Sequence, residues 1–240
     1  MLNFKGGNMQ YKGLAMMHPE FRQDLTSLKV SWYYTWGTSQ DLLNDSSYIP
    51  MSRDGSIVNL PNNYSGFLLV FNEPNNPEPY GCNITPIVAI ERYRILGNKF
   101  PKAKMVVGGI SCWDSAYSGD WLKTFCSLLK TQKLPKPYAL AVHGYRESWI
   151  TVSDIKSWWV KQQKIVGTKV WITEMGDTEG NVANLKSLID WIKKQSWIER
   201  YAVFTNRSNH EAWSIGDGVN LIDWNTGKLT AIGEYYASIK

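Results

Sequence analysis

Two glutamates, each near the end of an apolar run, are the residues best placed to do chemistry. Glu73 follows the apolar residues 68–71 and precedes the proline-rich segment 74–81, and Glu174 lies near the end of the run at 169–175. Apolar runs of this length, bounded by turn residues, are typical of strands buried on both faces. A carboxylate at the exit of such a strand suits acid–base or nucleophilic chemistry. The alternative is an ordinary solvated glutamate where the chain reaches the surface.

The elements that would carry these glutamates alternate along the chain. Most gaps between apolar runs hold a segment with helical periodicity, and strands that alternate with helices pair in parallel because each crossover needs about a dozen residues. The alternation predicts an α/β fold, a single (β/α)8 TIM barrel that forms one domain over residues 1–240, with some irregular early crossovers between residues 37 and 66. An open doubly wound sheet is the alternative, but no G-x-G-x-x-G motif follows the first run. The eight candidate strands are residues 12–17, 30–36, 48–52, 67–73, 104–110, 138–145, 169–175 and 200–207.

Helix signals are clearest in the second half of the chain. Thr85 and Pro86 provide an N-cap and a proline at the first helical position. Thr151 and Asp154 have the spacing of a capping box. Apolar periodicity predicts two further helices, at residues 182–192 and 230–239.

In a barrel of this type the active site lies at the carboxyl ends of the strands. Glu73 then ends the fourth strand and Glu174 the seventh, so the two carboxylates face each other across one barrel mouth. Glycoside hydrolysis uses such a pair, one to protonate the leaving oxygen and one to meet the developing oxocarbenium charge. In a retaining enzyme the pair would lie about 5–5.5 Å apart. Other polar residues expected at strand ends are His143, Tyr145, Asn206 and Arg207.

The two carboxylates would need different environments. Glu73 must stay protonated near neutral pH, which an apolar strand end and the charge of Glu174 both favour. Glu174 must be ionised, and a hydrogen bond from Tyr145 or Arg207 would favour that form. His143 could orient either carboxylate, or it could be satisfied by the backbone of a neighbouring strand.

Aromatic residues are abundant, with 12 Trp and 13 Tyr. Such side chains suit a site built from flat apolar faces. Tyr34 and Trp36 share one face of the second run with Trp32, and Trp36, nearest the strand end, is a candidate to stack on a sugar ring. Trp113 and Trp213, in loops on the same side, are candidates for sugar contact. With Glu174 pointing inward, strand alternation predicts that Trp171 faces the helix layer. Core or surface packing is expected of Trp158, Trp159 and Trp191, on the helices.

Composition excludes several other classes of protein. The net charge of +5 is spread over 26 basic and 21 acidic residues with no run of five like charges, which argues against nucleic acid as a partner. The three histidines show no i, i+4 pair, so we expect neither a metal nor another cofactor. Three cysteines allow at most one bridge, with Cys82–Cys112 the candidate pair. No apolar stretch is long enough for a signal peptide or a membrane span, and we expect a soluble monomer.

Short motifs in the chain resemble those of known glycosidases. "NEP" at the fourth run and "WITE" at the seventh resemble the signature of clan A glycoside hydrolases, which are retaining enzymes on (β/α)8 barrels. In order, "VSWYYTWG", "YIPM", "LLVFNEPN", "AVHGY", "VWITEMG" and "ERYAVF" resemble glycoside hydrolase family 128, the endo-β-1,3-glucanases. The resemblance extends over about residues 12 to 236.

This resemblance implies a role for each matching residue. Glu73 would be the general acid/base, Glu174 the nucleophile, and Asn72 the residue that binds the sugar 2-hydroxyl. The implied substrate is a β-1,3-glucan such as laminarin, cut internally, and an enzyme with this substrate would be secreted or extracellular. No cofactor is implied.

The chain departs from the family pattern at a few positions. "HGY" stands where the family usually shows "HWY", so we expect Gly144 to remove an aromatic surface near the site. "GGISCWD" follows the fifth run, and "RDGS" follows "YIPMS". These changes put the substrate preference in question. The alternatives are a clan A enzyme for another β-glycan, such as mannan or xylan, and a non-catalytic carbohydrate-binding barrel.

Overall fold

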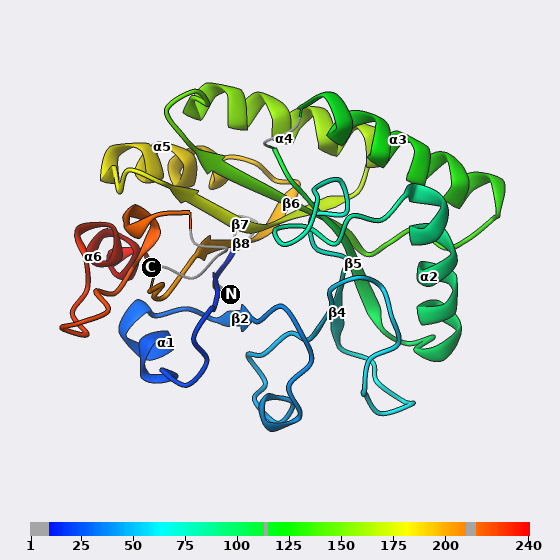
Figure 1. The fold of residues 1–240 in the computed structure, drawn as a ribbon, viewed down its shortest axis with the longest axis horizontal. Coiled ribbons are helices and arrows are strands. Elements are labelled where there is room, and N and C mark those ends of the chain that lie inside the picture. The colour runs from blue at the N-terminus through cyan, green and yellow to red at the C-terminus, as the bar shows by residue number, and fades with distance from the viewer. Residues whose placement is uncertain (1–9, 113–114, 210–214) are drawn as a thin grey trace, which may run out of the picture.

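The computed structural model describes residues 10–112, 115–209 and 215–240 (Figure 1). Eight parallel strands form one sheet in the order β2-β1-β8-β7-β6-β5-β4-β3, which confirms the predicted (β/α)8 barrel. Each apolar run of the sequence overlaps one strand. The strands are β1 (Tyr11–Ala15), β2 (Trp32–Tyr34), β3 (Met51–Ser52), β4 (Phe67–Val70), β5 (Lys104–Ile110), β6 (Ala139–Arg146), β7 (Lys169–Asp177) and β8 (Ile198–Phe204).

The barrel closes between β2 and β3 through a short contact. Tyr33 and Tyr48 form an isolated parallel bridge, in which the Ile49 amide donates to the Tyr33 carbonyl at 2.9 Å. Because β3 is only two residues long, this bridge takes the place of a full ladder. The barrel is therefore nearly closed, with only a short backbone contact between its second and third strands.

The helices cover the barrel unevenly. In Figure 1, α2 to α5 lie along the outside of β5 to β7, whereas the blue to cyan chain between β2 and β4 consists mainly of loops. That difference confirms the irregular early crossovers, where only a short 3-10 helix forms. The helices are α1 (Gln23–Leu28), η1 (Gln40–Leu42), α2 (Pro86–Lys99), α3 (Ser115–Thr131), α4 (Val152–Val166), α5 (Val182–Ile192), η2 (Asp217–Val219) and α6 (Ala231–Ser238).

The predicted helix starts are confirmed by their hydrogen bonds. The Thr85 side chain accepts a hydrogen bond from the Val88 amide at the start of α2. At the start of α4, Thr151 and Asp154 form both halves of a capping box. These contacts satisfy amide groups that the first turn of a helix leaves without a backbone partner.

One of the two buried clusters lies inside the barrel. This cluster contains no α-helix residue. It includes the strand residues Trp32, Tyr34 and Trp171, and the ring centroids of Trp32 and Trp171 are 5.5 Å apart. The second cluster packs the outer strand faces against the helices and includes Trp158 and Trp159. The core roles predicted for the helical tryptophans are thus confirmed, and Trp191 packs against the same cluster.

The predicted direction of Trp171 is wrong. On β7, Ile172 pairs with Val142 of β6 and Glu174 pairs with His143, so Thr173 has no partner on that strand. Such a bulge shifts the alternation of side chains by one residue. Trp171 and Glu174 therefore both point into the barrel.

Two further predictions concern a disulfide bond and membrane-spanning helices. All three cysteines are free thiols, so Cys82 and Cys112 do not form a bridge. No helix in the described part of the chain is long and apolar enough to cross a membrane.

Gly144 faces the helix layer rather than the barrel mouth. A Cβ atom added to it would lie 2.5 Å from Cζ2 of Trp159 and 2.8 Å from Cγ2 of Ile155, both on α4. The Trp159 indole fills this space, and its Nε1 donates to the His143 carbonyl at 3.1 Å. The expectation that Gly144 removes an aromatic surface from the site is therefore wrong, because strand alternation points this position away from the mouth.

We predict that Gly144→Ala lowers the free energy of unfolding by about 1–3 kcal/mol, because the new methyl group would overpack the Trp159 contact. Gly97→Ala is the matched control. Gly97 lies in α2, an added Cβ there would meet nothing within 4 Å, and the helix should gain up to about 1 kcal/mol. Urea denaturation of both variants measures the difference. Equal stability of Gly144→Ala and the wild type would contradict the predicted overpacking against Trp159.

Candidate active site

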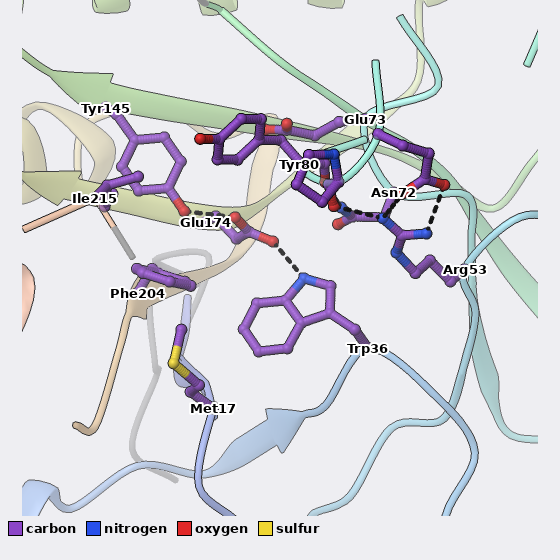
Figure 2. A pocket seen from close by; sticks show the side chains of 12 residues that line it. Met17, Trp36, Arg53, Asn72, Glu73, Tyr80, Tyr145, Glu174, Phe204 and Ile215 are labelled. Carbon is purple, nitrogen blue, oxygen red and sulfur yellow. Dashed lines mark hydrogen bonds and ion pairs between the residues drawn. The ribbon is translucent and has the colours of Figure 1, made fainter. Parts of the chain in front are cut away.

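Glu73 and Glu174 meet at the carboxyl ends of the strands. One carboxylate oxygen of each residue and a ring nitrogen of His143 all lie within 4.8 Å of one another. Both carboxylates are buried, with Glu73 4% and Glu174 5% exposed. Figure 2 shows Glu174 near the centre of the pocket, with Tyr145 and Trp36 directed toward it.

Glu174 accepts hydrogen bonds from three aromatic side chains. The Tyr34 hydroxyl and the Trp36 indole donate to Oε1 at 2.7 and 3.0 Å, and the Tyr145 hydroxyl donates to Oε2 at 2.5 Å. Burial, together with the charge of Glu174, raises the pKa of Tyr34 and of Tyr145 well above the ordinary tyrosine value. Both phenols therefore stay protonated and can donate. The Glu174 carboxylate is thus fixed in position by three side-chain donors.

Glu73 has a different set of partners. His143 Nδ1 lies 2.7 Å from its Oε1, and Asn76 Nδ2 donates to its Oε2 at 2.8 Å. Burial raises the pKa of Glu73, the hydrogen bond and charge of His143 oppose this, and the charge of Glu174 raises the pKa further. The net direction is upward, which favours a protonated Glu73.

His143 lies between the two carboxylates and is fully buried. Its Nδ1 is 3.4 Å from Glu174 Oε2 as well as 2.7 Å from Glu73 Oε1. Burial lowers the pKa of His143, but the charge of Glu174 and the hydrogen bond to Glu73 outweigh it and raise the pKa. Its Nε2 has no hydrogen-bond partner among the described residues. His143 thus orients the carboxylates from behind.

A turned backbone brings Asn72 and Glu73 to the same pocket. Phe71 and Glu73 have positive φ angles of 72° and 45°, a conformation that costs side-chain-bearing residues free energy. The Glu73 amide donates to the Gly109 carbonyl at 3.0 Å, which fixes this turn to β5. Gly81 closes the following loop, where an added Cβ would lie 2.2 Å from the Glu73 carbonyl oxygen. Only glycine leaves room for this approach.

The two glutamates line a pocket of about 450 Å³. Its walls combine apolar and aromatic faces with a few polar groups, a composition that suits an uncharged ligand with apolar faces and hydroxyl groups. The lining residues are Met17, Trp36, Arg53, Asn72, Glu73, Glu78, Pro79, Tyr80, Tyr145, Glu174, Phe204 and Ile215.

The residues proposed from the sequence to bind substrate differ in where they lie relative to the pocket. Asn72, Trp36 and Tyr145 line the pocket with the two glutamates. Tyr34 and His143 are fully buried behind the carboxylates, which they hydrogen-bond. Trp113 and Trp213 lie outside the described residues.

Arg207, which was also proposed to bind substrate, forms a buried ion pair with Asp24. Its Nε and Nη2 donate to the two oxygens of Asp24 at 2.9 and 2.8 Å, and the guanidinium lies 4.2 Å from the Phe21 ring centroid. The expected support of Glu174 by Arg207 is not seen, because Asp24 of α1 engages the guanidinium group. Tyr34 and Trp36 provide the additional hydrogen bonds.

Sequence reasoning missed Asn76 and the segment that follows it. Asn76 stands three residues after Glu73, and Glu78, Pro79 and Tyr80 all line the pocket. The turn-rich string "PNNPEPYG" directly after Glu73 was the available signal, because a loop at a strand's carboxyl end faces the barrel mouth.

A metal ion is one further possibility for the cluster of Glu73, His143 and Glu174, whose ligand atoms are close enough to share one. The carboxylate oxygens, however, already accept hydrogen bonds from Tyr34, Trp36, Tyr145 and Asn76. This pattern favours a hydrogen-bonded carboxylate pair over a set of metal ligands.

Comparison with known proteins identifies relatives of this barrel. The sequence profile of the family described as glycosyl hydrolase catalytic core matches residues 13–236. No curated protein matches the chain in sequence.

Similar solved structures share the fold over nearly the whole chain. A curdlan-specific exo-β-1,3-glucanase of family 128 from Blastomyces gilchristii has 23% identity and a TM-score of 0.72, covering 98% of this chain and 100% of its own. A family 128 endo-β-1,3-glucanase from Amycolatopsis mediterranei, bound to laminaritriose, has 16% identity and a TM-score of 0.71, covering 95% and 99%. A family 128 oligosaccharide-binding protein from Trichoderma gamsii has 14% identity and a TM-score of 0.68, covering 96% and 93%. At these identities the likeness shows the barrel fold, and it agrees with the family that the motifs resemble.

The raised pKa of Glu73 gives a testable dependence of stability on pH. A carboxyl group whose pKa is raised on folding stabilises the protein at low pH, and this contribution is lost as the pH rises through the folded-state pKa. Glu73→Gln cannot ionise, so it should become progressively more stable than the wild type as the pH is raised from about 4, the ordinary glutamate value, toward neutral. Urea denaturation over this range measures the difference.

Glu78 provides a control of opposite sign. Its hydrogen bond from Arg53 lowers its pKa, so the small stabilising effect of this exposed pair is present near neutral pH and lost as the pH falls. Glu78→Gln should therefore be slightly less stable than the wild type near neutral pH and equal to it in acid. A gain for Glu73→Gln that does not change with pH would rule out ionisation of Glu73 as its cause.

Proposed function

We propose that this chain, which belongs to the glycosyl hydrolase catalytic core family, is a retaining glycoside hydrolase that cleaves β-1,3-glucan internally. The observation that carries the proposal is the unequal environment of two adjacent carboxylates. Glu174 accepts three hydrogen bonds, which fix its carboxylate in position as the proposed nucleophile. Glu73 has a raised pKa, which favours a general acid.

The separation of the pair supports the retaining mechanism. Carboxyl groups lie about 5–5.5 Å apart in retaining glycosidases and about 6.5–9.5 Å apart in inverting ones, which must leave room for a water molecule. One oxygen of each glutamate lies within 4.8 Å of the other, which is an upper bound on their closest approach rather than the distance between the two carboxyl groups. This close approach favours direct attack by one carboxylate on the sugar.

The reaction proceeds by double displacement. Glu73 donates its proton to the glycosidic oxygen while Glu174 attacks the anomeric carbon, so that the leaving sugar departs and a glycosyl ester forms. The ionised Glu73 then takes a proton from water, the water oxygen attacks the same carbon, and Glu174 leaves as a carboxylate. Asn72 lines the pocket next to Glu73 and is the proposed contact for the sugar 2-hydroxyl, with its Nδ2 donating to the Tyr80 carbonyl at 3.2 Å.

The choice of β-1,3-glucan rests on the ordered motifs and on the structural neighbours. An endo-acting neighbour binds laminaritriose, while others are an exo-acting enzyme and an oligosaccharide-binding protein. The presence of both carboxylates favours an enzyme over a binding protein, and a clan A enzyme for another β-glycan is the alternative substrate assignment. Because the substrate is a polymer, we infer that the chain acts outside cells, as one monomeric catalytic domain without a cofactor.

The two catalytic roles can be separated by substitution. Glu174→Ala should lose activity on all substrates, with azide restoring turnover as an α-glycosyl azide, because the small anion occupies the vacated face of the sugar. Glu73→Ala should slow substrates with poor leaving groups by about 10²–10⁴-fold but still form the glycosyl enzyme from substrates with good leaving groups. Product analysis by NMR measures both. Formation of a β-glycosyl azide by the Glu174 variant would show that the two roles are reversed, with Glu73 as the nucleophile.

The substrate assignment is tested with a panel of polymers. Linear β-1,3-glucan, mixed-linkage glucan, cellulose, mannan and xylan are compared at equal concentration, following oligosaccharides over time. We expect short β-1,3-oligosaccharides as early products, since internal cleavage releases a range of lengths. Release of glucose alone would indicate exo action. Preferential cleavage of mannan, xylan or cellulose would contradict the β-1,3 assignment and leave the catalytic pair in place.

A further inference from the structure

Tyr80 is an aromatic side chain exposed on the wall of the catalytic pocket. It is 45% exposed, and among the described residues none stacks on its ring or hydrogen-bonds its hydroxyl group. Isolated exposed aromatics are common on protein surfaces, but this one borders the cavity that holds both glutamates. We propose that Tyr80 is a stacking platform for a glucosyl unit next to the one that is attacked, an inference that rests on the proposed function.

The backbone around Tyr80 is fixed by Arg53. The guanidinium group of Arg53 forms two hydrogen bonds with the Glu78 carboxylate, both at 3.0 Å. Its Nη2 also donates to the carbonyl oxygens of Pro79 at 2.9 Å and Gly81 at 3.0 Å. The residues before and after Tyr80 are thus held by one planar group. A ring on such a segment needs little ordering when a ligand binds, which favours affinity.

The carbonyl of Tyr80 is itself connected to the catalytic residues. It accepts the hydrogen bond from Asn72 Nδ2, and Asn72 directly precedes Glu73. A sugar oriented by Asn72 would therefore have Tyr80 as its neighbour along the chain of the polymer. In Figure 2, Tyr80 and Trp36 lie on either side of Glu174. The Trp36 indole already donates to Glu174, whereas the Tyr80 ring is 45% exposed beside the same pocket.

Stacking would select the shape of the ligand rather than a charge. The apolar C–H face of a β-linked glucosyl ring packs against a flat aromatic ring, and the phenolic hydroxyl is not needed for this contact. Arg53 adds no net attraction for an acidic sugar, because Glu78 neutralises it. The expected ligand is therefore a neutral β-1,3-oligosaccharide that extends beyond the attacked unit.

The test measures binding of a β-1,3-linked glucose hexasaccharide in a Glu174→Gln background, together with kcat/KM for the same hexasaccharide in otherwise wild-type protein. Tyr80→Ala and Tyr80→Leu should weaken binding and lower kcat/KM by about 3- to 10-fold, the range of a single aromatic contact. Tyr80→Phe, which keeps the ring, should bind like the parent. Tyr11→Ala is the matched control, because Tyr11 is 40% exposed on β1 at the opposite end of the barrel.

Failure of the platform and failure of the proposed function give different results. If Tyr80→Ala and Tyr80→Leu bind and cleave the hexasaccharide like the parent, the platform is overturned and the hydrolase assignment stands. If Tyr80→Phe loses as much as Tyr80→Ala, the hydroxyl rather than the ring face makes the contact, and stacking is overturned. If the wild-type protein neither binds nor cleaves any β-1,3-oligosaccharide, the proposed function fails and the platform with it.

Discussion

Two buried carboxylates within 4.8 Å of each other are the constraint around which the rest of the site is arranged. If both were ionised, two like charges this close in a buried site would repel each other by several kcal/mol, about 4 kcal/mol for charges about 4 Å apart at an effective dielectric constant of about 20. The two carboxylates have different hydrogen-bond partners, and this difference reduces the repulsion. Three aromatic donors hydrogen-bond the Glu174 carboxylate, whereas burial raises the pKa of Glu73. The asymmetry that makes the pair tolerable is also the asymmetry that acid-assisted bond cleavage needs.

The barrel brings these partners together from distant parts of the chain. Tyr34 comes from β2, Glu73 from the end of β4, His143 and Tyr145 from β6, and Glu174 from β7. Departures from regular strand geometry then aim the side chains, through positive φ angles at Phe71 and Glu73 and an unpaired Thr173 in β7. A strictly regular β7 with Trp171 pointing inward would have turned Glu174 toward the helices. Local irregularity is thus part of how the site is built.

Features that depend on local signals could be predicted from the sequence. Apolar runs and turn residues located the eight strands, Thr85 and Thr151 located two helix starts, and the position of Glu73 and Glu174 at strand ends predicted that they meet in one pocket. Features that depend on register or on distant partners could not. The Thr173 bulge reversed the prediction for Trp171, and Arg207 pairs with Asp24, 183 residues away in sequence. The Arg53 contacts with Glu78 to Gly81 likewise require knowing that two loops lie side by side.

The contact between Gly144 and Trp159 has a consequence for how related sequences can diverge. The indole of Trp159 occupies the volume that any side chain at position 144 would need, and it also caps the carbonyl of His143. A larger residue at position 144 therefore needs space that both Trp159 and Ile155 of α4 now occupy. These positions are energetically coupled, so the order of substitutions decides how stable the intermediate is. Divergence beneath His143 is then expected to occur by coupled replacement rather than by independent drift.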